Sequence, residues 1–246
     1  MKFKNSCRYI LILSCLIFFS SGCNKTEEEA PALETGSVTD ADGNVYKTVK
    51  IGDQWWMTEN LKVKSYRNGI PIPEVSNSDA WANRSAGAYC IYDNGNSASL
   101  PSGLLYNWYA VNDTGNIAPV GWHIPTDAEW KTLEQHLGMS PAESDKLGWR
   151  GSNEGDKLKI EGHTGWSAYG DVWATNESGF TALAGSCRLP NADFGQPGLF
   201  ATGFWWSRSE FQNTEAWYRY LDYKNSNVFR SHESKTYGFS VRCVKD

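Results

Sequence analysis

Three features are missing from this chain of 246 residues, and each absence excludes a class of protein. Positive charge is not in excess, since 23 Lys and Arg residues stand against 28 Asp and Glu residues, so a nucleic-acid partner is not expected. The apolar run at residues 9–19 is too short to cross a bilayer, which takes about 20 residues. Cys-x-x-Cys pairs are also missing, and the three cysteines after residue 23 lie far apart, so a structural zinc site is not expected.

Catalytic signatures are missing as well. The sequence contains no His-Glu-x-x-His pair, no phosphate-binding Gly-rich loop with Lys-Ser/Thr and no Gly-x-Ser-x-Gly elbow, and its four histidines are scattered. Cys187 beside Arg188 is a candidate nucleophile, but we favour a buried thiol or a disulfide to Cys243. Cys90 is the third cysteine, so one thiol is left over and the pairing stays open. We therefore expect no enzyme activity, no cofactor and no metal.

The N-terminus has the pattern of a secretory signal. A basic start up to Arg8 precedes the apolar run, and Ser20-Ser21-Gly22-Cys23 follows it. Small residues directly before a cysteine resemble the lipobox of bacterial lipoproteins, in which cleavage leaves the cysteine as the lipidated N-terminus. The resemblance implies a signal peptide over residues 1–22 and lipidation of Cys23, so that acyl chains anchor the protein to a membrane. Plain secretion, with Cys23 in a pro-segment, is the alternative.

Residues 23–36 are predicted to form a flexible tether. Its charge run, Glu27-Glu28-Glu29, repels itself and favours an extended, solvated chain. The same run resembles the acidic export signals that direct lipoproteins of the Bacteroidetes group to the outside of the outer membrane, and both interpretations stay open. Removal of residues 1–22 takes away three basic residues and changes the net charge from −5 to −8. The expected location is the outer membrane, lipid-anchored and exposed at the cell surface.

Residues 37–246 are predicted to be a single α+β domain with antiparallel sheets. Tight-turn signals at Asp42-Gly43 and Gly52-Asp53 separate alternating segments that predict strands, and alternation returns after residue 204. Two main helices are expected, over residues 103–111 and from a capping box at Thr126 and Glu129 to residue 137. A short third helix is expected at 141–148, and residues 150–203 are expected to be a long loop region rich in Trp and Gly.

Five sequence blocks, in the same order, resemble the Fibrobacter succinogenes major paralogous domain: residues 49–61, 105–111, 121–130, 176–180 and 237–244. The resemblance implies a domain of surface lipoproteins and implies little about chemistry. Residues 124–130 and Gly238-Phe239 are in turn similar to motifs of formylglycine-generating enzymes, which implies their C-type-lectin-like fold. Those enzymes bind copper through a close pair of cysteines that this sequence lacks, so the resemblance does not support that activity.

Tryptophan is present in excess, with 12 residues in the chain. Trp149, Trp166 and Trp173 lie in polar, Gly-rich sequence, and Asn176 and Glu177 follow them. A flat indole ring takes the apolar face of a pyranose while polar side chains bind its hydroxyls, so these five residues are the predicted ligand-binding site. The alternative is that the rings only pack a long loop.

The sequence therefore predicts a cell-surface binding module that recognises a glycan or another surface ligand without catalysis. A structural or adhesin-tip component that contacts other surface proteins is the alternative. A formylglycine-generating-like enzyme is the third and least expected function.

Overall fold

The computed structural model describes residues 32–95, 102–170, 172–195 and 200–246. The predicted signal peptide, the predicted lipidation site Cys23 and the tether up to residue 31 lie outside the described residues. From Leu33 onward the chain forms one unit. Its first strand, β1 (Thr35–Thr39), begins inside the stretch that was predicted to be tether. In the described part of the chain, no helix has the length and apolar character needed to cross a membrane.

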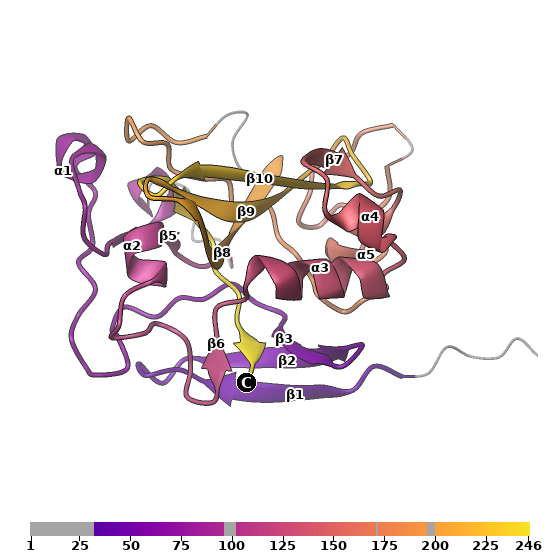
Figure 1. The fold of residues 1–246 in the computed structure, drawn as a ribbon, viewed down its shortest axis with the longest axis horizontal. Coiled ribbons are helices and arrows are strands. Elements are labelled where there is room, and N and C mark those ends of the chain that lie inside the picture. The colour runs from indigo at the N-terminus through magenta and orange to yellow at the C-terminus, as the bar shows by residue number, and fades with distance from the viewer. Residues whose placement is uncertain (1–31, 96–101, 171, 196–199) are drawn as a thin grey trace, which may run out of the picture. The chain divides into compact units, whose positions relative to one another are not determined.

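Three antiparallel sheets hold most of the regular structure (Figure 1). The five-stranded sheet has the order β1-β2-β3-β12-β6, with β2 (Val45–Ile51), β3 (Gln54–Met57), β12 (Val244–Lys245) and β6 (Trp122–His123). The four-stranded sheet has the order β7-β10-β9-β8, that is β7 (Gly148–Arg150), β10 (Val228–Ser234), β9 (Glu215–Asp222) and β8 (Thr202–Gln212). The three-stranded sheet pairs β11 (Gly238–Phe239), β5 (Leu105–Asn107) and β4 (Tyr89–Cys90) in that order.

Helix α3 (Asp127–His136) begins where the sequence predicts it. The Thr126 hydroxyl accepts the backbone N–H of Glu129, and the Glu129 carboxylate accepts the N–H of Thr126, which completes the capping box. The other described helices have only four or five residues: α1 (Ser78–Ala82), η1 (Tyr92–Gly95), α2 (Trp108–Val111), α4 (Pro141–Ser144) and α5 (Glu154–Leu158).

The helix predicted over residues 103–111 is wrong in its first half, so the described part of the domain has one main helix and not two. Residues 105–107 are strand β5, and only residues 108–111 are helical. Asn107 is the reason, because its side chain accepts the backbone N–H of Ala110 and starts the helix at Trp108. The short helix predicted at 141–148 is also cut to α4, since β7 begins at Gly148.

Helix α3 lies between the five-stranded and the four-stranded sheet (Figure 1). Trp130, Leu133 and Leu137 share one side of the helix at helical spacing, and all three are buried. The Trp130 ring lies 4.9 Å from the Trp56 ring of β3, measured between centroids, and 5.8 Å from the Phe180 ring. These rings belong to the core cluster that joins the two sheets.

Charged side chains are buried between α3 and the four-stranded sheet. We call Asp127, Glu134, Arg150, Arg219 and Arg230 the arginine network. Glu134 lies 2.6 Å from Nε of Arg219 and 2.9 Å from Nη1 of Arg150, and Asp127 lies 2.8 Å from Arg219 and 2.7 Å from Arg230. Burial favours a raised pKa for Asp127, but the hydrogen bonds and charges of Arg230 and Arg219 outweigh it and lower the pKa to about 2.

Candidate functional site

The face of the four-stranded sheet that points away from α3 carries a row of aromatic rings. Side chains alternate along a strand, so Arg219, which reaches α3, puts Tyr218 and Tyr220 on the other face. Trp149 and Tyr220 are the partners of Phe229 in the sheet register, and Phe204 is the partner of Tyr220. We call this row of residues the aromatic face: Trp149, Phe204, Tyr218, Tyr220 and Phe229.

The rings of the aromatic face touch one another across all four strands. The centroid distances are 5.2 Å from Trp149 to Phe229, 5.7 Å from Phe229 to Tyr220 and 4.6 Å from Tyr220 to Phe204, where the two rings are stacked. Trp149 remains 38% exposed, and Phe204, Tyr220 and Phe229 are half-buried. A ligand can therefore lie on a continuous strip of partly exposed ring surface.

A cavity of about 280 Å³, which we call the Glu233 cavity, adjoins the aromatic face at Phe204 and Tyr218. Along β10, Glu233 comes four residues after Phe229 and therefore lies on the same side of the strand. The rings of Phe204 and Phe239 are nearly parallel, with centroids 5.0 Å apart and an interplanar angle of 15°. The cavity is lined by four aromatic rings, one carboxyl, one thiol and two further residues: Phe204, Tyr218, Tyr237, Phe239, Glu233, Cys187, Leu189 and Gly195.

Glu233 supplies the charge of this cavity. Burial raises the pKa of its carboxyl, as does the charge of Glu215, whereas a backbone hydrogen bond from Ser234 and the charge of His232 lower it. Burial, followed by the charge of Glu233, also raises the pKa of Tyr218 and of Tyr237, so both phenols stay protonated at neutral pH. The cavity is thus an apolar, aromatic space with one carboxyl group.

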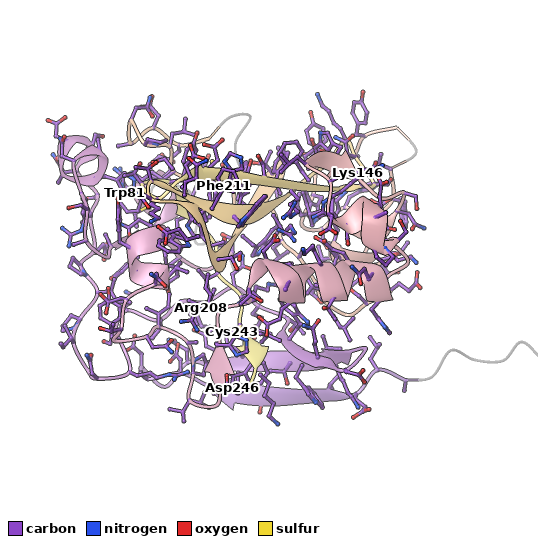
Figure 2. The ribbon with its side chains drawn as sticks, viewed as in Figure 1. Trp81, Lys146, Arg208, Phe211, Cys243 and Asp246 are labelled. Carbon is purple, nitrogen blue, oxygen red and sulfur yellow. The ribbon has the colours of Figure 1, made fainter. Side chains whose placement is uncertain are left out.

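Cys187 lies in the cavity wall as a buried free thiol. Burial raises its pKa to about 12, which leaves little thiolate at neutral pH and argues against the nucleophile alternative. The Cys187–Cys243 disulfide that the sequence suggested is not formed in the structure: Cys187 packs beside Gly195, and the backbone of Cys243 pairs with Met57. In the described part of the chain, Cys90 and Cys243 (Figure 2) are also free and buried.

Trp166 is the predicted site residue that the structure places in the core. Its side chain is 3% exposed, and its indole N–H donates to the carbonyl of Ala182 at 2.9 Å. The ring packs in the cluster of α3, so it offers no face to a ligand. This placement corrects the prediction for Trp166 and agrees with the alternative that a ring in this region packs the loop.

The other four predicted residues have separate roles. Trp149 belongs to the aromatic face, whereas Trp173 is 57% exposed and contacts the ring of His163. The side chain of Asn176 accepts the backbone N–H of Thr181 at 2.8 Å and so closes its own loop. Glu177 is exposed, 3.8 Å from Nζ of Lys157. No contact among the described residues joins these four side chains into one site.

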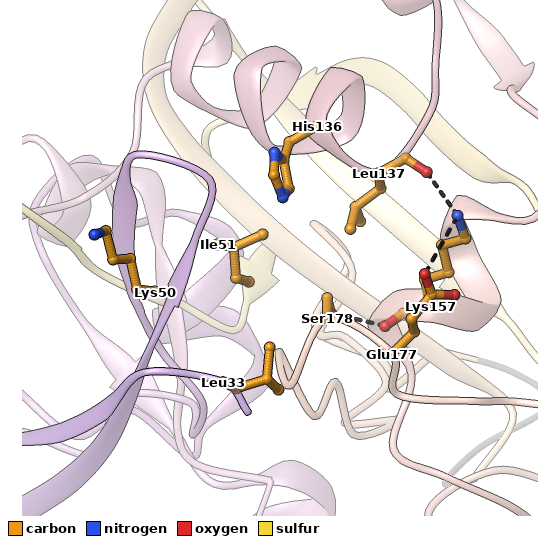
Figure 3. Close-up of a pocket in the computed structure, with 8 residues that line it drawn as sticks. All are labelled: Leu33, Lys50, Ile51, His136, Leu137, Lys157, Glu177 and Ser178. Carbon is orange, nitrogen blue, oxygen red and sulfur yellow. Dashed lines mark hydrogen bonds and ion pairs between the residues drawn. The ribbon is translucent and has the colours of Figure 1, made fainter. Parts of the chain in front are cut away.

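Glu177 lines a smaller pocket of about 130 Å³, together with Leu33 and His136 (Figure 3). Two hydrogen bonds join lining residues there, since Lys157 donates to the carbonyl of Leu137 at 2.9 Å and Ser178 donates to the carbonyl of Lys157 at 2.7 Å. A volume of this size has room for only a few water molecules. The aromatic face is therefore the stronger candidate site.

Sequence reasoning missed Phe204, Tyr218, Tyr220, Phe229 and Glu233. The sequence contains a pattern that points to some of these residues, because aromatic residues alternate with Arg219 and Leu221 in a stretch predicted to be a strand. Alternation alone does not tell which face of a strand is covered by the rest of the protein.

The described elements define an α+β domain, mostly of antiparallel sheets, with an aromatic cavity beside its four-stranded sheet. The chain belongs to the Fibrobacter succinogenes major domain family, which matches residues 49–245. This match confirms the family resemblance and spans β2 to β12, so it includes the aromatic face and the Glu233 cavity. Comparisons with curated proteins and with solved structures gave no match.

Proposed function

We propose that this protein is a lipid-anchored, cell-surface module that binds a glycan through the aromatic face, without catalysis. The observation that carries the proposal is the strip of touching rings from Trp149 to Phe204 that remains partly open to solvent. Sugar rings pack their apolar C–H faces on such surfaces, while neighbouring polar groups bind their hydroxyls. A C-type-lectin-like fold for the domain is part of the same proposal.

Polar groups lie beside the rings at suitable positions. Ser231 and Glu233 follow Phe229 on the same side of β10, and the Tyr220 hydroxyl donates to the Asp222 carboxylate at 3.2 Å. Hydroxyl and carboxylate oxygens can bind sugar hydroxyls as acceptors or donors. The aromatic face thus combines the apolar and the polar contacts that a saccharide needs.

The proposed anchor and the proposed ligand surface belong to different parts of the chain. The described unit begins at Leu33, directly before β1 of the five-stranded sheet, and α3 lies between this sheet and the four-stranded sheet (Figure 1). The aromatic face points away from α3. The proposed anchor at Cys23 precedes this unit in the sequence, and the aromatic face is the proposed ligand surface.

A glycan array with the purified protein tests the binding function. Trp149→Ala is expected to abolish the signal while the circular dichroism spectrum stays unchanged, because Trp149 is an exposed end of the ring strip. Trp173→Ala is the matched control, since it removes an exposed indole outside the aromatic face. Loss of binding in the Trp173 variant alone would instead support the loop site that the sequence suggested.

A flat array for the wild-type protein would contradict glycan recognition. Copurification of a stoichiometric surface protein would then favour the structural or adhesin-tip role. The anchor is tested separately, with Cys23→Ser and partitioning into detergent. The variant is expected to leave the detergent phase, and unchanged partitioning would contradict lipidation of Cys23.

A further inference from the structure

Among the described residues, Glu233 differs from the acidic residues of the arginine network in having no Lys or Arg paired with it. Asp127 and Glu134 are each paired with two arginines. Glu233 is half-buried, yet within the described ranges its carboxylate forms no ion pair. A carboxylate that has lost part of its hydration and has gained no cation is stabilised by any cation that can reach it.

The walls of the Glu233 cavity favour a cation for a second reason. Phe204 and Phe239 are stacked 5.0 Å apart, and the rings of Tyr218 and Tyr237 lie 5.0 Å and 5.3 Å from Phe239. The face of an aromatic ring is electron-rich and attracts an ammonium group. Among the described residues that line the cavity, none is Lys, Arg or His.

The size and the chemistry of the lining narrow the ligand further. A volume of about 280 Å³ lies below the range of most drug-sized pockets and suits one small group at the end of a larger ligand. A metal ion is disfavoured, because no group of three potential ligand side chains gathers in the part of the chain that the structure describes. An organic ammonium group with an apolar body meets both the rings and the carboxylate.

We propose that the Glu233 cavity binds an ammonium group and that the ligand carrying it is an amino sugar with an unacetylated nitrogen. The second half rests on the proposed glycan function, because the cavity adjoins the aromatic face at Phe204 and Tyr218. A sugar ring on the aromatic face then places its amine in the Glu233 cavity, where it donates to the carboxylate of Glu233.

Two probes of equal shape test the cavity by itself. Cyclohexylammonium and cyclohexanol are titrated into the purified protein, and amide chemical shifts in nuclear magnetic resonance spectra report the affinity. The cation is expected to bind at least about tenfold more tightly than the alcohol, because the ion pair with a carboxylate and the attraction of a positive charge to ring faces act on the cation alone. Equal affinities in the wild-type protein would overturn the proposal without any variant.

The residue assignment is tested with Glu233→Gln, which keeps the shape of the side chain and removes its charge. This variant is expected to bind cyclohexylammonium no better than cyclohexanol, with an unchanged melting temperature. Glu161→Gln removes an exposed carboxylate elsewhere and is expected to behave as wild type. An unchanged preference for the cation in Glu233→Gln would refute the role of Glu233.

A glycan pair separates this inference from the proposed function. The glucosamine tetramer is expected to bind at least about tenfold more tightly than the N-acetylglucosamine tetramer, and Glu233→Gln is expected to abolish the difference. Equal binding of both tetramers would overturn the inference and leave glycan recognition standing. Binding of cyclohexylammonium with no binding of either tetramer would keep the ammonium site and overturn the amino-sugar ligand together with the glycan function.

Discussion

Glu134→Gln is the most informative perturbation of the fold, because Glu134 holds α3 against the four-stranded sheet. Its side chain is fully buried and lies 2.6 Å from Nε of Arg219 and 2.9 Å from Nη1 of Arg150. The substitution keeps the volume of the side chain and removes its charge. Three buried guanidinium groups then face a single carboxylate, that of Asp127.

The expected cost follows from the burial of the charges. Removing one partner of a buried ion pair leaves the other charge uncompensated and typically costs about 3–5 kcal/mol of unfolding free energy. Because the total stability of a domain is about 5–15 kcal/mol, this is a large share of it. With a urea slope of about 3 kcal/mol per M, the unfolding midpoint of Glu134→Gln falls by more than about 1 M.

Urea denaturation followed by tryptophan fluorescence measures this shift. Glu34→Gln is the control, because it breaks an exposed ion pair, in which Glu34 lies 3.0 Å from Nζ of Lys50, and it is expected to cost less than about 0.5 kcal/mol. A Glu134→Gln midpoint equal to that of the wild type, with an equal slope, would refute the role given to the arginine network.

Three further predictions concern α3. Thr126→Ala removes the helix cap and is expected to cost about 1 kcal/mol in thermal unfolding, whereas a neutral result would mean that the capping box does not stabilise the helix. Trp130→Ala leaves a cavity among Trp56 and Phe180 and is expected to cost about 3–5 kcal/mol in urea unfolding, and a loss below about 1 kcal/mol would contradict its burial. Asp127 has a folded-state pKa of about 2 against an ordinary value of 3.8, so its ionisation contributes about 2 kcal/mol of stability that is present above pH 3.8 and is lost as the pH falls through about 2. The difference in unfolding free energy between wild type and Asp127→Asn is therefore expected to shrink by about that amount between about pH 5 and about pH 2, and a constant difference would count against the depressed pKa.

Helix 103–111 shows how a helical pattern in the sequence misleads. Leu104, Trp108 and Val111 have helical spacing, but Leu104 lies before strand β5 and the other two lie in α2. The side chain of Asn107 also accepts the backbone N–H of Ala88, a residue 19 positions away, and so binds this segment to the chain beside β4. A contact over that distance in sequence is invisible to periodicity, which sees only neighbouring residues.

The candidate site shows the same limit. Trp149, Trp166 and Trp173 look alike in sequence, since all three lie in polar, Gly-rich stretches. The structure separates them, because Trp149 joins the sheet through Phe229, Trp166 packs beneath α3, and Trp173 stays exposed. Composition indicated that aromatic rings matter in this protein, but only the pairing of distant strands shows which rings share a surface.

The sequence by itself determined the family, the first two hairpins and helix α3, because tight turns, capping boxes and buried stripes are written in residues a few positions apart. The tertiary structure alone decided that Tyr218 and Tyr220 lie on the face of β9 that points away from α3. Arg219 between them reaches Asp127, a residue 92 positions earlier, and this buried ion pair fixes which side of β9 is covered. Because the side-chain period of a strand is two residues, one such long-range contact sets the orientation of every neighbour along the strand.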